Sequence, residues 1–327
     1  MIFKIKDLKC KYKKGVHPVL LIDDLQINKG EVVFFLGASG VGKSTILETL
    51  GLMNDTILAD ENTIFDFNNG EHEIDMINIW KKKERFLSEF RTKYLSFIFQ
   101  NTNLFPNFNA EDNVLLTPML QGISEMESKN RVKPIFKKIF GKEVKEILGN
   151  KHVERNFLGK LSKKWKYKTI RGKKISEMSG GQKQRLAFVR AIASNYNVLF
   201  ADEPTGNLDF GNAKNLMQHL IDDIKEKSAT AVIVSHDLKL AIKYSDKIVF
   251  IDKIEAESLI DDLCVHKNNK TSKYHYGLIS ENNTYEKEDG GWRVKVNHDK
   301  KSPAIFSNKE LLAFLKNEMT KQTMENV

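Results

Sequence analysis

A glycine-rich segment at residues 37–44 constrains the fold more than any other part of the sequence. It runs Gly-Ala-Ser-Gly-Val-Gly-Lys-Ser and matches the pattern G-x-x-x-x-G-K-[ST]. The apolar run Val32–Leu36 precedes it and the helical pattern Lys43–Leu52 follows it, which is the strand–loop–helix setting that the pattern requires. Glycines let the backbone bend closely around a phosphate, and N–H groups at a helix start face the anion. The segment therefore predicts a phosphate-binding loop.

Short apolar runs rich in Val, Ile and Phe recur along the chain and alternate with helical patterns. Strands buried on both faces have this composition, so we expect an α/β core with a mostly parallel sheet. Residues 1–30 favour antiparallel strands, whereas residues 104–178 carry little strand pattern and are expected to be mainly helical. The expected strands are Val32–Leu36, Leu95–Phe99, Val198–Ala201, Ala231–Ser235 and Ile248–Ile251, and further expected helices are Gly181–Ala193, Ala213–Lys227 and Asp237–Tyr244.

The last part of the chain, residues 253–327, is polar and carries weaker patterns. Trp292–Val296 alternates like a strand. Ser307 and Glu310 have the spacing of a capping box, so a helix is expected to start at Ser307. We expect an α+β extension, either a regulatory or partner-docking addition or a stabilising appendage.

The composition is that of a soluble globular protein, with 41% hydrophobic residues. The apolar runs are far shorter than the roughly 18 residues that a membrane-spanning helix needs, and no signal peptide is recognisable at the start of the sequence. The two cysteines, Cys10 and Cys264, have no metal-binding or redox spacing. A reducing cytoplasmic compartment is the simplest expectation.

The positive charge of the chain is concentrated in one segment. The formal net charge is +9, yet residues 129–174 hold 17 Lys/Arg against 3 Asp/Glu, a local +14, which leaves −5 for the remainder. Four lysines in this segment flank two aromatic side chains that suit a membrane interface. An anionic lipid surface is one expected partner, and a solvated charge run is the alternative. The lysines are Lys163, Lys164, Lys166 and Lys168, and the aromatic residues are Trp165 and Tyr167.

Two further segments place polar groups beside apolar runs. Asp202 and Glu203 end the run that begins at Val198, where adjacent carboxylates are costly unless a cation or a reacting group uses them. Asp202 is therefore a candidate Mg²⁺ ligand, and Glu203 is a candidate general base for an attacking water. Residues 179–182, Ser-Gly-Gly-Gln, open a helical pattern and leave backbone N–H groups accessible to a phosphate.

Together these segments resemble one superfamily, the ATP-binding cassette (ABC) ATPases, over about residues 1–252. In that superfamily the turn at residues 179–182 completes the ATP site of a second subunit, so the resemblance implies a homodimer that forms on ATP binding. Met178 departs from the usual Leu, a swap between apolar side chains of similar volume. Residues 53–92 lack the usual glycine-rich hairpin motif, although Asn69-Gly70 suits such a turn.

The resemblance also assigns roles to single residues. Gln100 corresponds to the glutamine that senses Mg²⁺, Asp209 to the D-loop at the dimer seam, His236 to the switch histidine at the γ-phosphate, and Tyr12 to the aromatic residue that stacks on adenine. The implied sets are Glu203, His236 and Gln100 for catalysis; Tyr12, Gly37, Ser39, Gly40, Val41, Gly42, Lys43, Ser44 and Thr45 for ATP; Ser179, Gly180, Gly181 and Gln182 for the opposite subunit's site; and Ser44, Gln100 and Asp202 for Mg²⁺.

The run Ala201–Asp209 narrows the resemblance to ATPases of lipoprotein release, macrolide export and cell division. Such a protein would lie peripherally on the cytoplasmic face of the inner membrane and drive a separate permease-type partner by export, lipoprotein release or mechanotransmission. The expected organisation is a nucleotide-binding domain over residues 1–252, with a helical subdomain at about residues 101–178, and the extension 253–327.

Two other functions are compatible with the same residues. One is a nucleotide-gated scaffold of a membrane complex, in which ATP-driven assembly matters more than turnover. The other is a soluble nucleic-acid-associated ABC protein, which the basic segment suggests. Against the latter, the chain has a single cassette and lacks the long coiled coils of repair proteins, so nucleic acid is disfavoured as a partner.

Overall fold

The computed structural model describes residues 1–141, 146–155, 161–168, 170–206, 208–259, 271–289, 291–294 and 305–324. The chain divides into two compact units. The first unit comprises Met1–Leu95, Tyr196–Glu203 and Ile221–Val327, and the second comprises Ser96–Asn195 and Pro204–Leu220.

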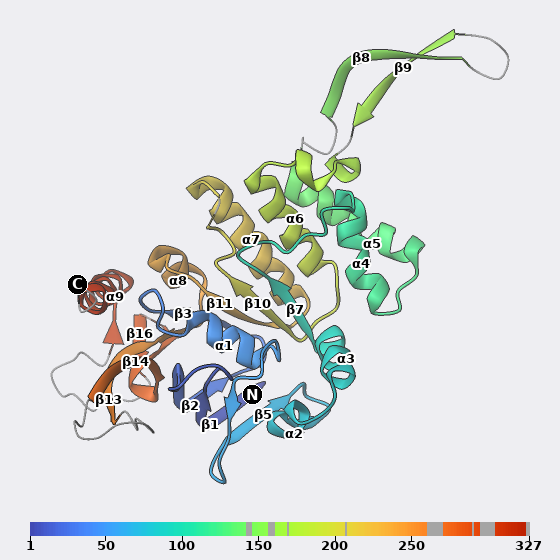
Figure 1. Cartoon of the computed structure of the whole chain (residues 1–327). Coiled ribbons are helices and arrows are strands. Elements are labelled where there is room, and N and C mark those ends of the chain that lie inside the picture. The colour runs from blue at the N-terminus through green and yellow to red at the C-terminus, as the bar shows by residue number, and fades with distance from the viewer. Residues whose placement is uncertain are drawn as a thin grey trace. The chain divides into compact units, whose positions relative to one another are not determined.

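An antiparallel sheet opens the first unit, as expected for residues 1–30 (Figure 1). Alternating apolar residues of β1 (Phe3–Cys10) are buried, and β1 pairs with both β2 (Leu20–Ile27) and β5 (Ile64–Asn68). The turn at Asn69-Gly70 joins β5 to β6 (Glu73–Asp75), so this predicted turn is confirmed. The short strand β4 (Ile57–Leu58) pairs with β1, and the helices α2 (Met76–Trp80) and α3 (Glu84–Tyr94) follow β6.

Four parallel strands form the centre of the second sheet of the first unit. Their order is β12 (Lys247–Phe250), β3 (Val32–Leu36), β11 (Thr230–Val234) and β10 (Val198–Asp202). β3, β11 and β12 are buried throughout, which explains why their residues, apart from Thr230 and Lys247 at the first positions of β11 and β12, are consecutive apolar ones rather than alternating. Helix α1 (Lys43–Leu50) follows β3, and α8 (Leu238–Tyr244) lies between β11 and β12 in the sequence.

The two sheets of the first unit share one apolar core. The rings of Phe3 in β1 and Phe200 in β10 have centroids 6.3 Å apart, and the ring of Phe67 in β5 lies 5.3 Å from that of Phe3. Fully burying side chains of this size contributes about 1.5–3 kcal/mol each. This packing holds the carboxyl ends of the parallel strands, where the candidate site residues lie, in fixed positions.

The C-terminal extension adds strands to both sheets. β14 (Thr271–Ile279) pairs in parallel with β2 and carries β13 (Asp252–Leu259) outside it. β15 (Thr284–Glu288) pairs antiparallel with β12, and β16 (Gly291–Val294) and β17 (Ile305–Phe306) continue that sheet. The chain ends in helix α9 (Asn308–Met324). Ser307 and Glu310 form the predicted capping box, because the backbone N–H of each donates to the side chain of the other.

The second unit is largely helical, with one exception. β7 (Leu95–Ile98) leads into it, and α4 (Ala110–Leu120), α5 (Glu125–Phe140) and α6 (Gly180–Ile192) pack on one another, while α7 (Phe210–Glu226) leads back to the first unit. The expectation of a mainly helical stretch is wrong for part of it, because β8 (Glu146–Arg155) and β9 (Leu161–Lys168) form an antiparallel hairpin. Aromatic residues at alternate positions, Trp165 and Tyr167, suit a strand better than a helix.

Candidate functional site

The predicted phosphate-binding loop connects β3 to α1 in the first unit. Gly40 and Gly42 have φ angles of 79° and 100°, in the left-handed region that residues with a Cβ rarely adopt. Gly42 is the N-cap of α1, so the loop ends where the free N–H groups of the helix begin. Ser39 and Gly40 are exposed, whereas Val41 is buried beneath them. The tip of the loop is therefore exposed to solvent, while the residue that follows the tip is fixed in the core.

The side chain of Lys43 is fixed by hydrogen bonds to the backbone of the phosphate-binding loop. Its Nζ donates to the carbonyl oxygens of Gly37 at 2.9 Å and Ala38 at 2.6 Å. Burial lowers the pKa of Lys43, while the carboxylates of Glu203 and Asp202 oppose that effect. A half-buried cation close to the free backbone N–H groups at the start of α1 is suited to binding an anionic phosphate.

Ser44 and Asp202 lie together although 158 positions separate them in the sequence, and the Ser44 hydroxyl donates to Asp202 Oδ2 at 3.2 Å. Burial raises the pKa of Asp202, and the hydrogen bond from Ser44 partly offsets this effect. A hydroxyl and a carboxylate are the hard oxygen donors that Mg²⁺ binds, commonly alongside waters and substrate phosphates. These two residues could hold Mg²⁺. Across the described ranges, no group of three or more His, Cys, Asp or Glu side chains is arranged to hold a metal ion by itself.

Glu203 and His236 form a second pair at the ends of neighbouring strands. His236 Nδ1 lies 2.8 Å from Glu203 Oε2, and the side chains are 70% and 13% exposed, respectively. Glu203 has a φ of 47°, an uncommon value for a residue with a side chain, and its N–H donates to Val234 O at 3.0 Å. Such strained backbone is concentrated at functional sites. A sheltered carboxylate beside an accessible imidazole can accept a proton from water.

Tyr12 lies next to α1 and is half-buried. Its hydroxyl donates to Glu48 at 2.5 Å and lies 3.2 Å from the Thr45 hydroxyl. Burial, followed by the hydrogen bond to Glu48, raises the pKa of Tyr12 to about 12. The structure thus brings the predicted residues Tyr12 and Thr45 into contact.

The Ser179–Gln182 turn lies in the second unit and starts α6. Ser179 Oγ accepts from the N–H of Gln182 at 3.2 Å, and Gln182 Oε1 accepts from the N–H of Ser179 at 3.2 Å, which makes a reciprocal capping box. Ser179 and Gly180 are exposed, and an added Cβ at Gly180 would meet nothing within 4 Å. Met178 is buried behind the turn, as an apolar replacement for Leu should be.

Gln100 follows β7 in the second unit and is exposed. In the loop that follows, Thr102 and Asn103 have φ angles of 55° and 45°, and Arg190 of α6 donates to their carbonyl oxygens at 2.8 Å and 2.6 Å, respectively. Sequence reasoning missed Arg190, because no local pattern marks which loop a helical arginine reaches. Asp209 is the cap of α7, since its carboxylate accepts from the N–H of Asn212 at 3.0 Å.

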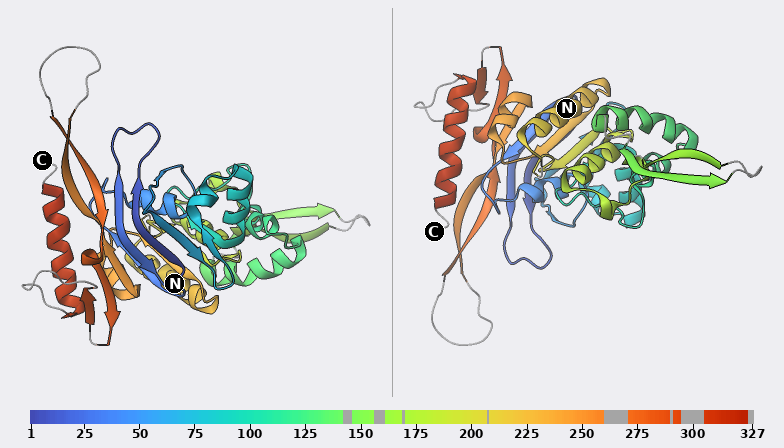
Figure 2. Two further views of the ribbon diagram at one scale, coloured as in Figure 1. Left: turned by 90° about the horizontal axis from the view of Figure 1, so that it is seen from below. Right: turned by 90° about the horizontal axis from the view of Figure 1, so that it is seen from above.

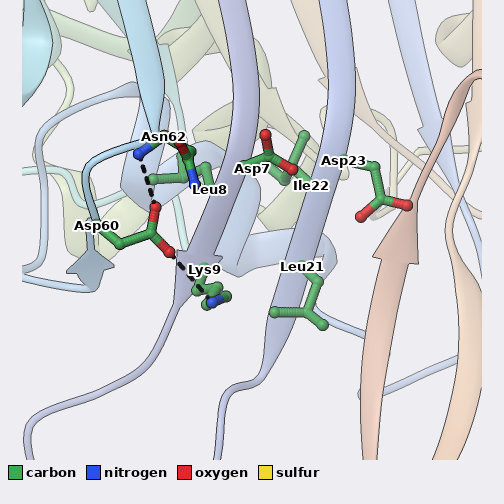
Figure 3. Close-up of a pocket in the computed structure, with 8 residues that line it drawn as sticks. All are labelled: Asp7, Leu8, Lys9, Leu21, Ile22, Asp23, Asp60 and Asn62. Atoms are coloured by element: carbon green, nitrogen blue, oxygen red, sulfur yellow. Dashed lines mark hydrogen bonds and ion pairs between the residues drawn. The ribbon is translucent and has the colours of Figure 1, made fainter.

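A pocket in the first unit lies apart from all of these residues (Figure 3). It is lined by β1, β2 and the loop before β5. Lys9 Nζ donates to Asp60 Oδ2 at 3.3 Å, and Figure 3 shows Asp60 facing both Lys9 and Asn62. Burial and the neighbouring Asp7 raise the pKa of Asp23 there. None of the predicted ATP-binding residues lines this pocket, so we do not assign it to the nucleotide.

A family model described as ABC transporter matches residues 22–206. The chain belongs to this family. It is an ABC-type ATPase, the ATP-binding subunit of an ABC transporter. The lipoprotein-releasing system ATP-binding protein LolD of Bacteroides thetaiotaomicron is 35% identical over 226 residues, 69% of this chain and 86% of that protein. The macrolide export ATP-binding/permease protein MacB of Neisseria meningitidis is 31% identical over 242 residues, 73% of this chain and 32% of that protein.

Solved structures of ABC cassettes share the fold. The dimeric post-hydrolysis state of the cassette MJ0796 bound to ADP and Pi has a TM-score of 0.58 and 27% identity, and the match covers 76% of this chain and 94% of that chain. Dimers are thus known for a cassette of this fold, with the products of ATP hydrolysis bound. Among the helices within the described ranges, none combines the length and apolar character that crossing a membrane requires.

Proposed function

We propose that the cassette is the motor of a lipoprotein-release or export complex, in which two copies close around two ATP molecules and drive a separate transmembrane partner. The similarity to LolD supports this assignment, because it spans 86% of that protein. We place the cassette on the cytoplasmic face of the membrane on the same basis. The nucleotide-binding domain would end near residue 252, and the extension would follow it.

The proposed ATP hydrolysis depends on two residue pairs, Ser44 with Asp202 and Glu203 with His236. Lys43 and the loop N–H groups bind the phosphates, and Tyr12 is assigned to adenine. The Ser44 hydroxyl and the Asp202 carboxylate would hold Mg²⁺, and the ion would neutralise charge on the phosphate oxygens. Glu203 accepts the proton of the attacking water, and His236, 2.8 Å away, orients that carboxylate. Glu203 beside His236 is the observation that favours hydrolysis over mere binding.

The exposed residues of the Ser179 turn are assigned to the ATP site of the partner copy. In the single chain, Ser179 and Gln182 exchange two hydrogen bonds between backbone N–H groups and side-chain oxygens. When the turn binds a phosphate of the partner copy's ATP, stronger hydrogen bonds to the charged phosphate would replace these neutral ones. Gln100 is assigned to sensing Mg²⁺, and Asp209 to the dimer seam. The basic segment 129–174 is assigned to the anionic membrane surface. The side chains of its lysines and aromatic residues from Lys163 to Lys168 lie outside the described residues.

The test is purification of the full chain from detergent-solubilised native membranes, with and without Mg-ATP. We expect a transmembrane protein with few spans to co-purify and to raise the ATPase rate on reconstitution into vesicles. A Lys43→Ala variant, which cannot hold the phosphates, serves as the control for nucleotide dependence. Recovery of the chain with nucleic acid and without any membrane protein would contradict the proposal.

A further inference from the structure

Helix α9 of the C-terminal extension contacts the backbone of the phosphate-binding loop. Leu311, Leu315 and Gln322 occupy one face of the helix at intervals of four and seven residues, and all three are buried. Figure 2 shows α9 lying along the strands of the extension. Its first turn is anchored by Trp292, whose Nε1 donates to Asn308 Oδ1 at 2.9 Å. Gln322, near the other end, is only 7% exposed, which is unusual for a glutamine.

The side-chain amide of Gln322 takes the place of a peptide group between β3 and β12. The two strands pair in parallel up to Leu36 and Phe250, and Ile251 N then donates to Leu36 O at 2.8 Å. The next bond of a parallel ladder would run from Ala38 N to Ile251 O. Instead, Ala38 N donates to Gln322 Oε1 at 3.2 Å, and Gln322 Nε2 donates to Ile251 O at 3.3 Å. The amide thus lengthens the ladder by one step, onto the second residue of the loop.

A second contact joins the extension to the other end of the loop. A Cβ added to Gly277 of β14 would lie 2.0 Å from Val41 O and 2.8 Å from a methyl group of Ile251. Only glycine allows the backbone of β14 to lie this close to Val41. The N–H of Gly277 also donates to Val19 O at 2.9 Å, which fixes the strand in this position. The extension therefore contacts the loop at both Ala38 and Val41.

We propose that Gln322 is a positioning residue for nucleotide binding, through which the C-terminal helix fixes the phosphate-binding loop in its binding conformation. Ala38 is held on both sides, because its N–H donates to Gln322 and its carbonyl accepts from Lys43. Loss of the amide leaves the Ala38 N–H and the Ile251 carbonyl buried without this partner, and the loop moves to satisfy them. This effect on the loop concerns nucleotide binding by the chain itself and does not involve the membrane partner.

The first test compares Gln322→Leu with Asn317→Leu, which removes an amide from an exposed position of the same helix. We measure the Kd for ADP by calorimetry, together with KM and kcat for ATP. For Gln322→Leu we expect Kd and KM to rise about tenfold, equivalent to about 1.4 kcal/mol, with kcat within about twofold of wild type. Asn317→Leu should leave all three unchanged. An unchanged Kd in folded Gln322→Leu would overturn the proposal.

A second variant, Gln322→Glu, preserves the size of the side chain and makes the effect depend on pH. The introduced carboxylate accepts from Ala38 N but repels Ile251 O, and burial raises its pKa. Once protonated, the carboxyl group offers one acceptor and one donor, as the amide does. The ratio of variant to wild-type Kd for ADP should therefore fall as the pH decreases from about 8 to about 6. A ratio that stays elevated and constant over this range would refute the positioning role.

The contact at Gly277 provides an independent comparison with a matched control. Gly277→Ala pushes on the loop at Val41, whereas Gly291→Ala places a Cβ 2.4 Å from Phe306 O, inside the extension and away from the loop. Both variants should lower Tm, but only Gly277→Ala should raise the Kd for ADP, by about fivefold or more. An equal rise in both variants would show that the extension acts only through global stability, contrary to the proposal.

Discussion

Replacement of Glu203 by glutamine should abolish most hydrolysis and leave binding intact. Glutamine preserves the size of the side chain, and its Oε1 can still accept a hydrogen bond from His236 Nδ1, which lies 2.8 Å from Glu203 Oε2. The variant loses only the basicity. A general base contributes about 10²–10⁴-fold, or about 2.7–5.5 kcal/mol, so we expect kcat to fall by about 10³-fold.

The contribution of His236 should be smaller and should depend on Glu203. A hydrogen bond to a charged group is worth about 1.5–3 kcal/mol, but the imidazole is 70% exposed, so solvent screening reduces this to about 1 kcal/mol. His236→Ala should therefore slow turnover by about five- to tenfold. If His236 acts by orienting Glu203, the double variant should be about as slow as Glu203→Gln alone.

The assay is phosphate release under single-turnover conditions, with Tm as a control for folding and light scattering to follow assembly. Glu203→Gln should be a monomer without nucleotide and a stable dimer in saturating Mg-ATP. Near-normal turnover in Glu203→Gln would remove Glu203 from its assigned role. Effects that multiply in the double variant would show that His236 acts directly on the substrate rather than through Glu203.

Three further expectations follow from other parts of the cassette. Arg190→Met keeps most of the length of the side chain but can donate to neither carbonyl oxygen of the loop after Gln100, so we expect a destabilisation of about 2 kcal/mol, measured by urea unfolding, and a loss of turnover. Burial raises the pKa of Cys10 from 9.0 to about 11. The neutral thiol therefore makes its full contribution to the free energy of unfolding below pH 9 and loses it as the pH rises through 11. The free energy of unfolding should fall by about 2–3 kcal/mol over this range, and Cys10→Ala should abolish this pH dependence. Co-sedimentation with anionic vesicles should weaken with salt and decrease when glutamine replaces the basic residues Lys163, Lys164, Lys166 and Lys168, whereas equal sedimentation with neutral vesicles would contradict a membrane role.

Local patterns were sufficient to predict several parts of the fold. The capping box at Ser307 and Glu310, the turn at Asn69-Gly70 and the loop at residues 37–44 each depend on residues within a few positions of one another. Ser44 and Asp202 were each assigned to a Mg²⁺ site from their motifs, and the Ser44 hydroxyl lies 3.2 Å from Asp202 Oδ2 in the structure. Periodicity and motif spacing carry this kind of information.

Long-range pairing could not be predicted in the same way. Within the extension the sequence marks only Trp292–Val296 as strand-like, and nothing in it shows that β15 pairs with β12 or that β14 pairs with β2. The strand β9 was missed because its alternating aromatic residues lie within a dense run of lysines, and its partner β8 carries no clear strand pattern. Arg190 and Gln322 are further examples, since each acts through backbone carbonyl or N–H groups far away in sequence, which have no side-chain signature.

Ala38 is the point at which nucleotide binding and the extension meet. Lys43 binds its carbonyl oxygen in the free chain, and incoming phosphates compete with that carbonyl for the ammonium group. The loop then loses an internal bond at the moment when it must hold its shape around the phosphates. Ordering one residue costs about 1–2 kcal/mol in backbone entropy. The hydrogen bond from Ala38 N to Gln322 does not involve Lys43 and therefore persists. Because this bond already orders Ala38 in the free chain, less backbone entropy is lost when nucleotide binds. A helix that bonds to the backbone of the phosphate-binding loop can thus increase the affinity for ATP.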